Sequence, residues 1–356
     1  MLPCVRAFAL SAAFLYNRRM ALELARGGLA EEPPAITMKA AHHMKNHVAL
    51  YASFLLLLAA ASLAAAQGLE SPYLDASVPW LRGNLHTHTT NSDGDKAPQA
   101  VVDAYAALGY DFLMLSDHDR LTETAPLDAK GMVLIPGAEI TGKGPHMLQV
   151  GAKTLAVPDK DRQVVIDKIN TEAGGFVIMN HPNWTANFNH CDFDTLMKLQ
   201  GYVGMEIYNG VVLFLEGSEL ATDKWDRLLA KGHRVWGFAN DDSHRDNHRA
   251  LGWSMVQCAS RNAEDILAAM RAGHFYASTG VKVDEIRTEG YTVTVKAANA
   301  QCFRVYADGG KMLARIAGHE MSFTAKPDLK DCTYVRVECY GEGDALAWLQ
   351  PMFLKK

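Results

Sequence analysis

The sequence is poor in cysteine and proline and has no strong excess of charge of either sign. Its 356 residues include six Cys and 13 Pro, and 35 Lys and Arg stand against 40 Asp and Glu, for a formal net charge of −5. No CxxC pair occurs, so zinc-ribbon chemistry is not expected. With 49% hydrophobic residues, the composition excludes a disordered chain, a collagen-like fibre and a multi-span membrane protein. The small acidic excess argues against a nucleic-acid partner held on a broad basic face.

The one long apolar run lies in the first fifth of the chain. Residues 48–66 carry no charge, Lys45 precedes them, and the small residues Ala64 and Ala66 end the run. This pattern is typical of a secretory signal peptide with an A-x-A cleavage site. We therefore expect residues 1–66 to be an N-terminal extension and signal peptide, and the rest to be exported, periplasmic or secreted. The alternative is an uncleaved membrane anchor, because about 18 apolar residues can span a bilayer.

Export would place the cysteines in an oxidising compartment. Five of them lie beyond residue 66, and Cys302, Cys332 and Cys339 share the C-terminal segment. One disulfide among these three is possible. The odd number leaves at least one free thiol or an intermolecular bond.

From residue 80 to residue 280, short apolar runs alternate with amphipathic stretches. Several runs are continuously apolar and bounded by Gly or Pro, as expected for strands buried on both faces. The predicted strands are 81–86, 111–116, 132–139, 146–152, 175–180, 203–209 and 234–240. The predicted helices are 97–109, 159–174, 191–200, 216–232 and 263–273. No full helix separates the third and fourth runs, so we expect a hairpin-like loop there.

This order predicts an α/β fold with a parallel barrel of the (β/α) kind. From residue 281 onward, β-branched and polar residues alternate between Gly-rich turns, which predicts a small antiparallel β module. We therefore expect three parts: the extension and signal peptide over 1–66, a barrel over 67–280, and a β-rich C-terminal module over 281–356.

Histidines and carboxylates gather at the ends of the predicted strands. His86 and His88 end the first run, and Asp242 and His244 follow the seventh. Residues i and i+2 of a strand point to the same face, so each pair can aim at one ion. Parallel barrels carry their working residues on the loops after the strands, which predicts a metal site there. Further candidates at these ends are Asp93, His118, Glu139, His146 and His181.

Imidazoles and carboxylates without thiolates suit Mn²⁺, Fe²⁺ or Zn²⁺ rather than Cu(I). The donors are too many for one ion, so two or three ions are expected. Of the two aspartates in NDDSH, the D-x-H spacing selects Asp242, and Asp241 would face the other way or support the site. Asp117 and Asp119 could orient the ring of His118.

In order along the chain stand the motifs LHTHTTNSDG, LSDHD, GAEIT…H, NHPNW, EIYNG and NDDSH. Over residues 81–280 the sequence thereby resembles the polymerase and histidinol phosphatase (PHP) domain, a metallohydrolase on a distorted, TIM-barrel-like (β/α)7 fold. The β-rich tail ending in AWLQPMF and the segment FYASTG look more like an exported branch that includes carbaryl-hydrolase-like enzymes. The resemblance implies two or three divalent ions (Mn²⁺, Zn²⁺ or Fe²⁺) held by His86, His88, Asp93, His118, Glu139, His146, His181, Asp242 and His244.

The predicted reaction is hydrolysis by a metal-bridging hydroxide, which paired ions generate at neutral pH. Asp242, His244 and His118 would act at the metal centre, and His190, His248 or an ordered water could protonate the leaving group. The sequence has no GxSxG elbow, and Cys191 has no papain-like context, so no protein nucleophile is predicted.

Four residues are candidates for substrate binding. Lys143, Arg245 and Arg249 could meet a phosphate oxygen or could be solvated loop charges, and Asn209 is placed at the rim. The metal set and the basic loops favour a phosphoesterase acting on small phosphate mono- or diesters. The alternatives are a carboxyl-ester, carbamate or amide hydrolase and a non-catalytic metal-binding barrel. The expected partner is a small-molecule ester rather than a nucleic acid. Membrane contact would come only from an uncleaved signal segment, and the oligomeric state stays open.

Overall fold

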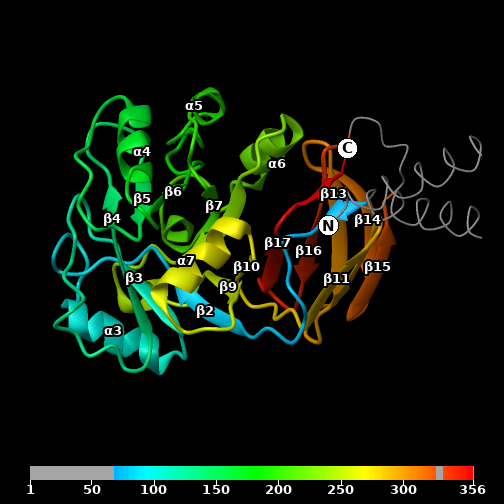
Figure 1. Cartoon of the computed structure of the whole chain (residues 1–356), viewed down its shortest axis with the longest axis horizontal. Coiled ribbons are helices and arrows are strands. Elements are labelled where there is room, and N and C mark those ends of the chain that lie inside the picture. The colour runs from blue at the N-terminus through cyan, green and yellow to red at the C-terminus, as the bar shows by residue number, and fades with distance from the viewer. Residues whose placement is uncertain (1–67, 326–331, 356) are drawn as a thin grey trace, which may run out of the picture. The chain divides into compact units, whose positions relative to one another are not determined.

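A computed structural model describes residues 68–325 and 332–355 of the chain (Figure 1). The predicted extension and signal peptide over 1–66 lie outside the described residues, so their assignment stays a prediction. Within the described ranges, no helix combines the length and the apolar character needed to cross a bilayer.

Each of the seven apolar runs forms a strand, and the strands pair in sequence order from β2 to β8. Strands β3, β5, β6 and β7 are buried along their whole length, which explains why their sequences are nearly free of charge. A parallel bridge between Thr87 and Ser243 joins the end of the first strand to the end of the last. The predicted distorted barrel is therefore confirmed. The strands are β2 (Trp80–Asn84), β3 (Phe112–Leu115), β4 (Val133–Ile140), β5 (Met147–Val150), β6 (Phe176–Met179), β7 (Gly204–Asn209) and β8 (Trp236–Asn240).

The direction of β5 departs from an all-parallel barrel. It runs antiparallel to both β4 and β6, whereas the pairs β2–β3, β3–β4, β6–β7 and β7–β8 are parallel. The link between β4 and β5 spans only residues 141–146, and a parallel crossover needs about a dozen residues or more. The expected hairpin-like loop is thus the local cause of the distortion.

Helices form at all five predicted positions. Asp161, Asp192 and Asn262 cap the first turns of α4, α5 and α7 with their side chains, and α3 has a proline in its first turn. Gly273 ends α7 in the left-handed conformation at φ 79°. The helices are α3 (Pro98–Ala107), α4 (Arg162–Asn170), α5 (Phe193–Lys198), α6 (Thr222–Ala230) and α7 (Ala263–Ala272), with short 3₁₀ turns η1 (Gly210–Phe214) and η2 (Asp246–His248).

The sheet continues from the barrel into the C-terminal segment. Antiparallel pairs run from β2 through β9 and β10 to β17 and β16, so the hydrogen-bonded ladder crosses residue 280 without a break. The predicted antiparallel module is present at the C-terminus, as Figure 1 shows in orange and red. Its strands and those that flank it are β1 (Leu69–Glu70), β9 (Trp253–Gln257), β10 (Phe275–Ser278), β11 (Glu285–Glu289), β12 (Thr292–Lys296), β13 (Cys302–Ala307), β14 (Lys311–Ala317), β15 (Glu320–Thr324), β16 (Tyr334–Tyr340), β17 (Leu346–Leu349) and β18 (Met352–Leu354).

The five described cysteines are all free thiols. Cys302 pairs in register with Tyr340, and Cys339 pairs with Phe303. Because neighbouring residues of a strand point to opposite faces, Cys302 and Cys339 lie on opposite faces of the sheet. The disulfide considered within this segment is therefore not formed, although two of its candidate residues sit on adjacent strands.

Candidate metal centre

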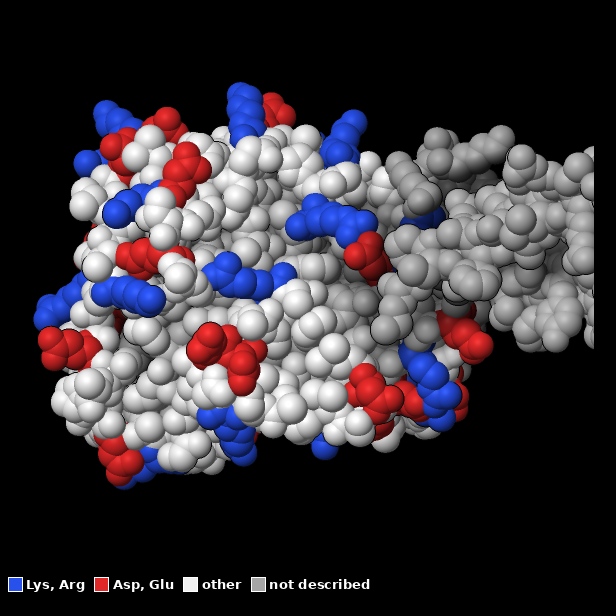
Figure 2. All heavy atoms as spheres, viewed as in Figure 1, with Lys and Arg blue, Asp and Glu red and all other residues white. Residues whose placement is uncertain are grey.

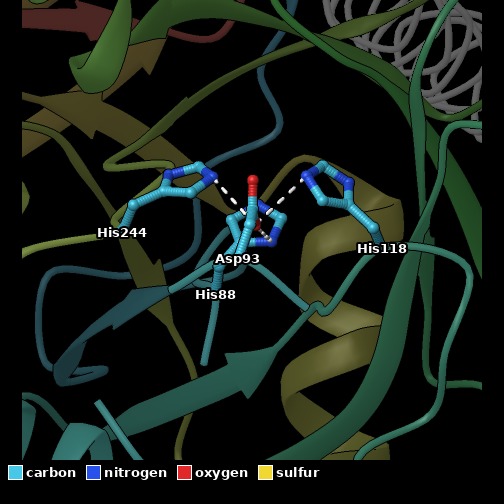
Figure 3. Close-up of side chains that lie close together, drawn as sticks. All are labelled: His88, Asp93, His118 and His244. Carbon is cyan, nitrogen blue, oxygen red and sulfur yellow. Dashed lines mark ion pairs between the residues drawn. The ribbon is translucent and has the colours of Figure 1, made fainter. Parts of the chain in front are cut away.

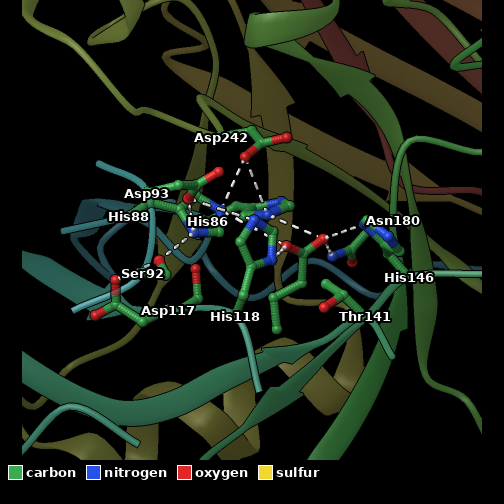
Figure 4. Close-up of polar contacts among 12 residues, drawn as sticks. His86, His88, Ser92, Asp93, Asp117, His118, Thr141, His146, Asn180 and Asp242 are labelled. Atoms are coloured by element: carbon green, nitrogen blue, oxygen red, sulfur yellow. Dashed lines mark hydrogen bonds and ion pairs between the residues drawn. The ribbon is translucent and has the colours of Figure 1, made fainter. Parts of the chain in front are cut away.

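The side chains predicted as metal ligands lie together at the carboxyl ends of the barrel strands (Figure 4). His86 and His88 follow β2, Glu139 lies near the end of β4, His181 follows β6, and Asp242 follows β8. The parallel pairing brings these ends to one edge of the sheet, as parallel barrels do. The other members of the cluster are Asp93, His118, His146 and His244.

A first group of donors surrounds Asp242. Its Oδ1 lies 3.2 Å from Nε2 of His86 and 3.0 Å from Nε2 of His88. The carboxylate of Glu139 lies 3.3 Å from the first ring and 3.6 Å from the second. Four donors at about 2.1 Å from one ion would be about 3.4 Å apart in tetrahedral geometry. The spacing of His86, His88 and Asp242 therefore fits a single divalent ion, with the carboxylate of Glu139 within reach of both rings.

A second group shares Glu139 with the first. Its Oε1 lies 3.2 Å from Nδ1 of His146 and 3.2 Å from Nε2 of His181. One carboxylate thus reaches donors of two groups, which is how a carboxylate bridges neighbouring ions.

The third group centres on Asp93, whose carboxylate stands between His118 and His244 in Figure 3. Its Oδ1 lies 3.4 Å from Nε2 of His118 and 3.3 Å from Nε2 of His244, and Nδ1 of His88 is 3.7 Å away. The Asp93 side chain is 55% exposed, so this group is the one nearest to solvent.

Several of these donor atoms are buried and unsatisfied. Within the described part of the chain, Nε2 of His86, Nε2 of His88, Nδ1 of His146 and Oδ1 of Asp242 are enclosed without a hydrogen-bond partner. Buried polar atoms normally have partners, because an unmade bond costs about 1–3 kcal/mol. A set of orphaned nitrogens and oxygens that converge on the same points fits bound cations.

The carboxylates favour positive charge on two imidazoles of the cluster, whereas burial lowers the pKa of His88. Burial works to lower the pKa of His86, but nearby carboxylates, that of Asp242 foremost, raise it well above its usual value. Burial likewise opposes the charge of His118, but hydrogen bonds to Asp93 and Glu139 raise its pKa to about 10. A field that draws protons onto imidazoles also attracts divalent cations. The residues present therefore fit a centre of two or three such ions.

Glu206 is a functional candidate that the sequence analysis missed. Its Oε1 lies 2.7 Å from Nδ1 of His86 and accepts from Nδ2 of Asn240, while Oε2 accepts from the backbone of His181 and from Nδ2 of Asn209. A carboxylate on the far nitrogen of a ligating histidine fixes its tautomer and ring orientation. The sequence signal for Glu206 was a single acidic residue within an otherwise uncharged run, and that run forms a fully buried strand.

The backbone is strained where the donors leave their strands. His181 and Asp242 have φ values of 25° and 53°, and Asp119 has 47°. Residues other than glycine rarely adopt this left-handed region, although Asp and His enter it more often than most. Such strain gathers at functional sites, where the surrounding contacts hold it in place.

The acidic neighbours of the donors stabilise loops. Asp117 accepts hydrogen bonds from Thr89 and Ser92, and Asp119 accepts from the backbone of Thr141. Within the described ranges neither aspartate bonds the ring of His118, so the orientation expected from them is not found. Glu139 takes that place instead, with Oε2 2.8 Å from Nδ1 of His118.

Asp241 faces away from the metal donors, which is one of the two arrangements predicted for it. It is fully buried, and its carboxylate accepts hydrogen bonds from Tyr105 and from the backbone of Ala250, Leu251 and Gly252. Burial raises the pKa of Asp241 to about 6, although these hydrogen bonds work to lower it. Asp241 thereby ties the loop after η2 to the end of β8.

A cleft of about 330 Å³ opens onto the cluster. Besides metal donors it is lined by the cationic or titratable pair Arg245 and His248, and by four apolar or aromatic side chains. A volume of this size suits a small molecule. We call the four apolar or aromatic side chains the apolar lining: Trp184, Val211, Val212 and Leu215.

The four residues predicted to bind substrate occupy different positions relative to the cleft. Arg245 lines the cleft, whereas Lys143 is exposed on the β4–β5 loop and does not line it. Arg249 pairs with Asp246. Asn209 is buried and donates to Glu206 and to Oδ2 of Asp242. A role in substrate binding stays a prediction for each of them.

His190 lies beside the second group of donors. Its Nε2 accepts a hydrogen bond of 3.0 Å from the backbone N–H of His146, and its ring centre is 4.9 Å from that of His181. Burial lowers the pKa of His190 to about 3, so the ring is neutral at physiological pH. Its role as a proton donor stays a prediction.

No protein-family model matches the sequence, and no curated protein matches it. A solved structure with a similar fold is a two-domain protein from Bacteroides vulgatus that contains a predicted PHP-like metal-dependent phosphoesterase. It has 17% identity and a TM-score of 0.47, over 81% of this chain and 90% of that chain. An amidohydrolase from Chromobacterium violaceum has 17% identity and a TM-score of 0.34, over 46% and 87% of the two chains. A lesion-specific endonuclease from Pyrococcus furiosus has 13% identity and a TM-score of 0.38, over 54% and 56%.

The class of protein follows from the chain's own site. Imidazoles and carboxylates on the strand ends of a barrel, with a cleft open above them, form the donor set of a metal-dependent hydrolase. The motifs along the chain resemble those of PHP domains, and its strands form the barrel that this resemblance predicts. The closer resemblance to a carbaryl-hydrolase-like branch stays a prediction.

Proposed function

We propose that the protein is a metal-dependent phosphoesterase that acts on small phosphate mono- or diesters. The observation that carries this proposal is the position of Arg245, which follows the donor His244 directly in sequence and lines the same cleft as the metal donors. A guanidinium presents a planar fork of N–H donors that matches phosphate oxygens. A cation beside a metal centre is the arrangement that a dianionic ester needs.

The bound ions would polarise the ester as Lewis acids and lower the pKa of water. His86, His88, Glu139 and Asp242 would hold one of them. The chain itself orients these donors, since Glu206 fixes the ring of His86 through a contact of 2.7 Å. Arg245 would offset the negative charge of the bound phosphate and of its transition state.

Hydrolysis of a carboxyl ester, carbamate or amide is the second candidate. The observation that favours it is the apolar lining, because a neutral ester needs less positive charge and more apolar contact than a phosphate does. A non-catalytic metal-binding barrel is a third candidate, against which the convergence of imidazole and carboxylate donors on an open cleft argues.

A hydrolysis panel on the metal-loaded full chain tests the proposal. It compares phenyl phosphate, a bis-aryl phosphodiester, a nucleotide, phenyl acetate and an aryl carbamate, with and without chelator. Phosphate release that stops on chelation supports a phosphoesterase, and cleavage of acetate or carbamate alone supports the second candidate. Asp242→Ala should abolish turnover under either enzymatic function.

Variants of basic residues distinguish a direct contact of Arg245 with phosphate from a general effect of positive charge on the protein. Arg245→Gln should raise KM for phenyl phosphate and leave turnover of phenyl acetate unaffected. Arg287, a 68% exposed side chain on β11, provides the matched control Arg287→Gln, which should change neither. Lys143→Gln tests the remaining prediction for an exposed lysine. Equal effects of all three variants would contradict the role proposed for Arg245.

The charged surface supports a small-molecule substrate. Figure 2 shows Lys and Arg scattered among Asp and Glu on the face in view, rather than gathered into a track for a polyanion.

We also propose that the protein is exported after cleavage at Ala66. N-terminal sequencing of protein recovered outside the cytoplasm tests this, and a mature chain that begins before residue 60 would contradict it.

A further inference from the structure

We infer that the apolar lining binds the hydrophobic alcohol part of the substrate, so that the preferred substrates are phosphate esters of hydrophobic alcohols rather than of sugars or other polyols. This inference rests on the proposed function and specifies its substrate class. The observation behind this inference is that Val211, Val212 and Leu215 line the same cleft as Arg245 and the metal donors.

The apolar lining comes largely from one short segment. Val211 and Val212 belong to η1, and Leu215 follows directly after it. Leu213, Phe214 and Leu215 are 49%, 52% and 49% exposed. Consecutive large apolar side chains at the surface are unusual in a soluble domain unless they contact a ligand or partner.

This segment is joined to the metal centre. Asn209 ends β7 immediately before η1, and its Nδ2 donates to Glu206 at 2.7 Å and to Oδ2 of Asp242 at 3.2 Å. Val211 and Val212 are themselves buried. The apolar lining is therefore held at a defined place relative to the metal donors.

The polar part of the lining connects to the same segment. The ring of Phe214 stacks on that of His248, with centroids 5.0 Å apart and an angle of 19° between the planes. His248, three residues after Arg245, lines the same cleft, and its backbone N–H donates to the carbonyl of Arg245 at 3.0 Å. A molecule in this cleft thus meets metal donors, a guanidinium, and aliphatic and indole side chains within one lining.

The chemistry of the two parts selects one occupant. The cation and the metal donors fit the phosphate group, and valine, leucine and tryptophan surfaces provide no hydrogen bonds for a polyol apart from the indole N–H. A polyol would lose its contacts with water there without replacement, whereas a hydrocarbon gains from leaving water. The cleft volume of about 330 Å³ suits one ring or a short alkyl chain.

Binding of two non-hydrolysable probes tests this inference independently of turnover. Phenylphosphonate and hydroxymethylphosphonate share the anionic group and differ in the apolar part. Isothermal titration of the metal-loaded full chain should show tighter binding of phenylphosphonate by at least about tenfold. Leu215→Asn and Val212→Thr should each reduce this preference about tenfold or more, mainly through phenylphosphonate.

Leu213→Asn is the matched control, because Leu213 has the same exposure, lies on the same segment and does not line the cleft. It should leave both affinities unchanged. Equal losses in Leu213→Asn and Leu215→Asn would indicate a general apolar surface, and equal binding of both probes to the unmodified protein would likewise overturn the inference. Far-ultraviolet circular dichroism checks that each variant is folded.

Turnover separates this inference from the proposed function. Faster cleavage of phenyl phosphate than of glycerol phosphate, with the preference reduced by Leu215→Asn, supports both. Equal cleavage of the two phosphates overturns the inference and leaves the phosphoesterase standing. Cleavage of phenyl acetate but of neither phosphate overturns the proposed function, and the phosphonate preference still decides what the apolar lining binds.

Discussion

Asp226 and Arg336 form a buried, two-pronged ion pair that joins helix α6 of the barrel to strand β16. Nε of the arginine donates to Oδ1 and Nη2 to Oδ2, both at 2.6 Å. Nη1 donates to Glu338 at 2.6 Å, and the hydroxyl of Tyr334 donates to Asp226 at 2.8 Å. The same helix carries Lys224, so one element links the C-terminal segment to a loop at the metal centre.

Breaking this pair should destabilise the whole fold. Arg336→Met leaves the carboxylates of Asp226 and Glu338 buried without their cation, for which we expect a loss of about 3–5 kcal/mol in the free energy of unfolding. Urea denaturation at pH 7 measures it. Arg287→Met, which removes an exposed partner of Glu285, should leave the unfolding midpoint unchanged. Equal midpoints for the two variants would contradict the role assigned to the pair.

Lys224 should hold the loop over residues 182–191. Its buried ammonium donates to the carbonyls of Pro182 and Cys191, both at 2.8 Å, and of Phe188 at 3.1 Å. Lys224→Met should therefore increase hydrogen exchange in this loop, measured by mass spectrometry. Lys198→Met, at the exposed end of α5, is the control. Exchange confined to α6 would show that the ammonium does not fix the loop.

Glu206→Gln should weaken metal binding without removing a donor. Both oxygens of Glu206 accept hydrogen bonds, whereas an amide offers one acceptor and turns an NH₂ group toward a donor; disturbing such a partner of a ligating histidine lowers metal affinity by roughly 10- to 100-fold. Competition with a fluorescent chelator measures the affinity of each site. Glu216→Gln, an exposed change on the loop that follows η1, should have no effect. An affinity equal to that of the unmodified protein would show that Glu206 has only a packing role.

Metal removal should lower thermal stability, and more so above neutral pH than in acid. Ions that bind only the folded chain stabilise it by about 2.7 kcal/mol when present at 100 times Kd. Protons compete with the ions for imidazole nitrogens such as those of His118, whose pKa is raised to about 10, so the gain from added Mn²⁺ should shrink as pH falls from 8 to 5. Differential scanning fluorimetry with and without chelator follows this gain. A constant gain across this range would contradict binding through imidazoles.

Thiol labelling should follow burial and pKa. Burial raises the pKa of Cys191 to about 12 and that of Cys332 to about 11, and it also raises the pKa of Cys339. These thiols stay protonated at pH 8, and only the thiolate reacts. Of the described cysteines, the half-buried Cys302 should react with iodoacetamide first. Peptide mapping before and after unfolding gives the comparison, and early labelling of Cys339 would contradict the buried position.

The sequence by itself determined the elements and most of the donors. Runs such as 111–116 became strands because their apolar composition reflects burial on both faces. His86 with His88, and Asp242 with His244, were recognisable by their i, i+2 spacing, although the structure places them beyond the ends of β2 and β8 and puts Asp242 and His244 in different donor groups.

Only the tertiary structure decided which distant groups meet. The pairing of Glu206 with His86 joins β7 to the segment that follows β2, over 120 positions of sequence. The gathering of nine donors from separate strand ends, and the presence of Val212 and Arg245 in the lining of one cleft, are of the same kind. Periodicity reports how one segment is buried, whereas contacts between segments are set by the packing of the whole sheet.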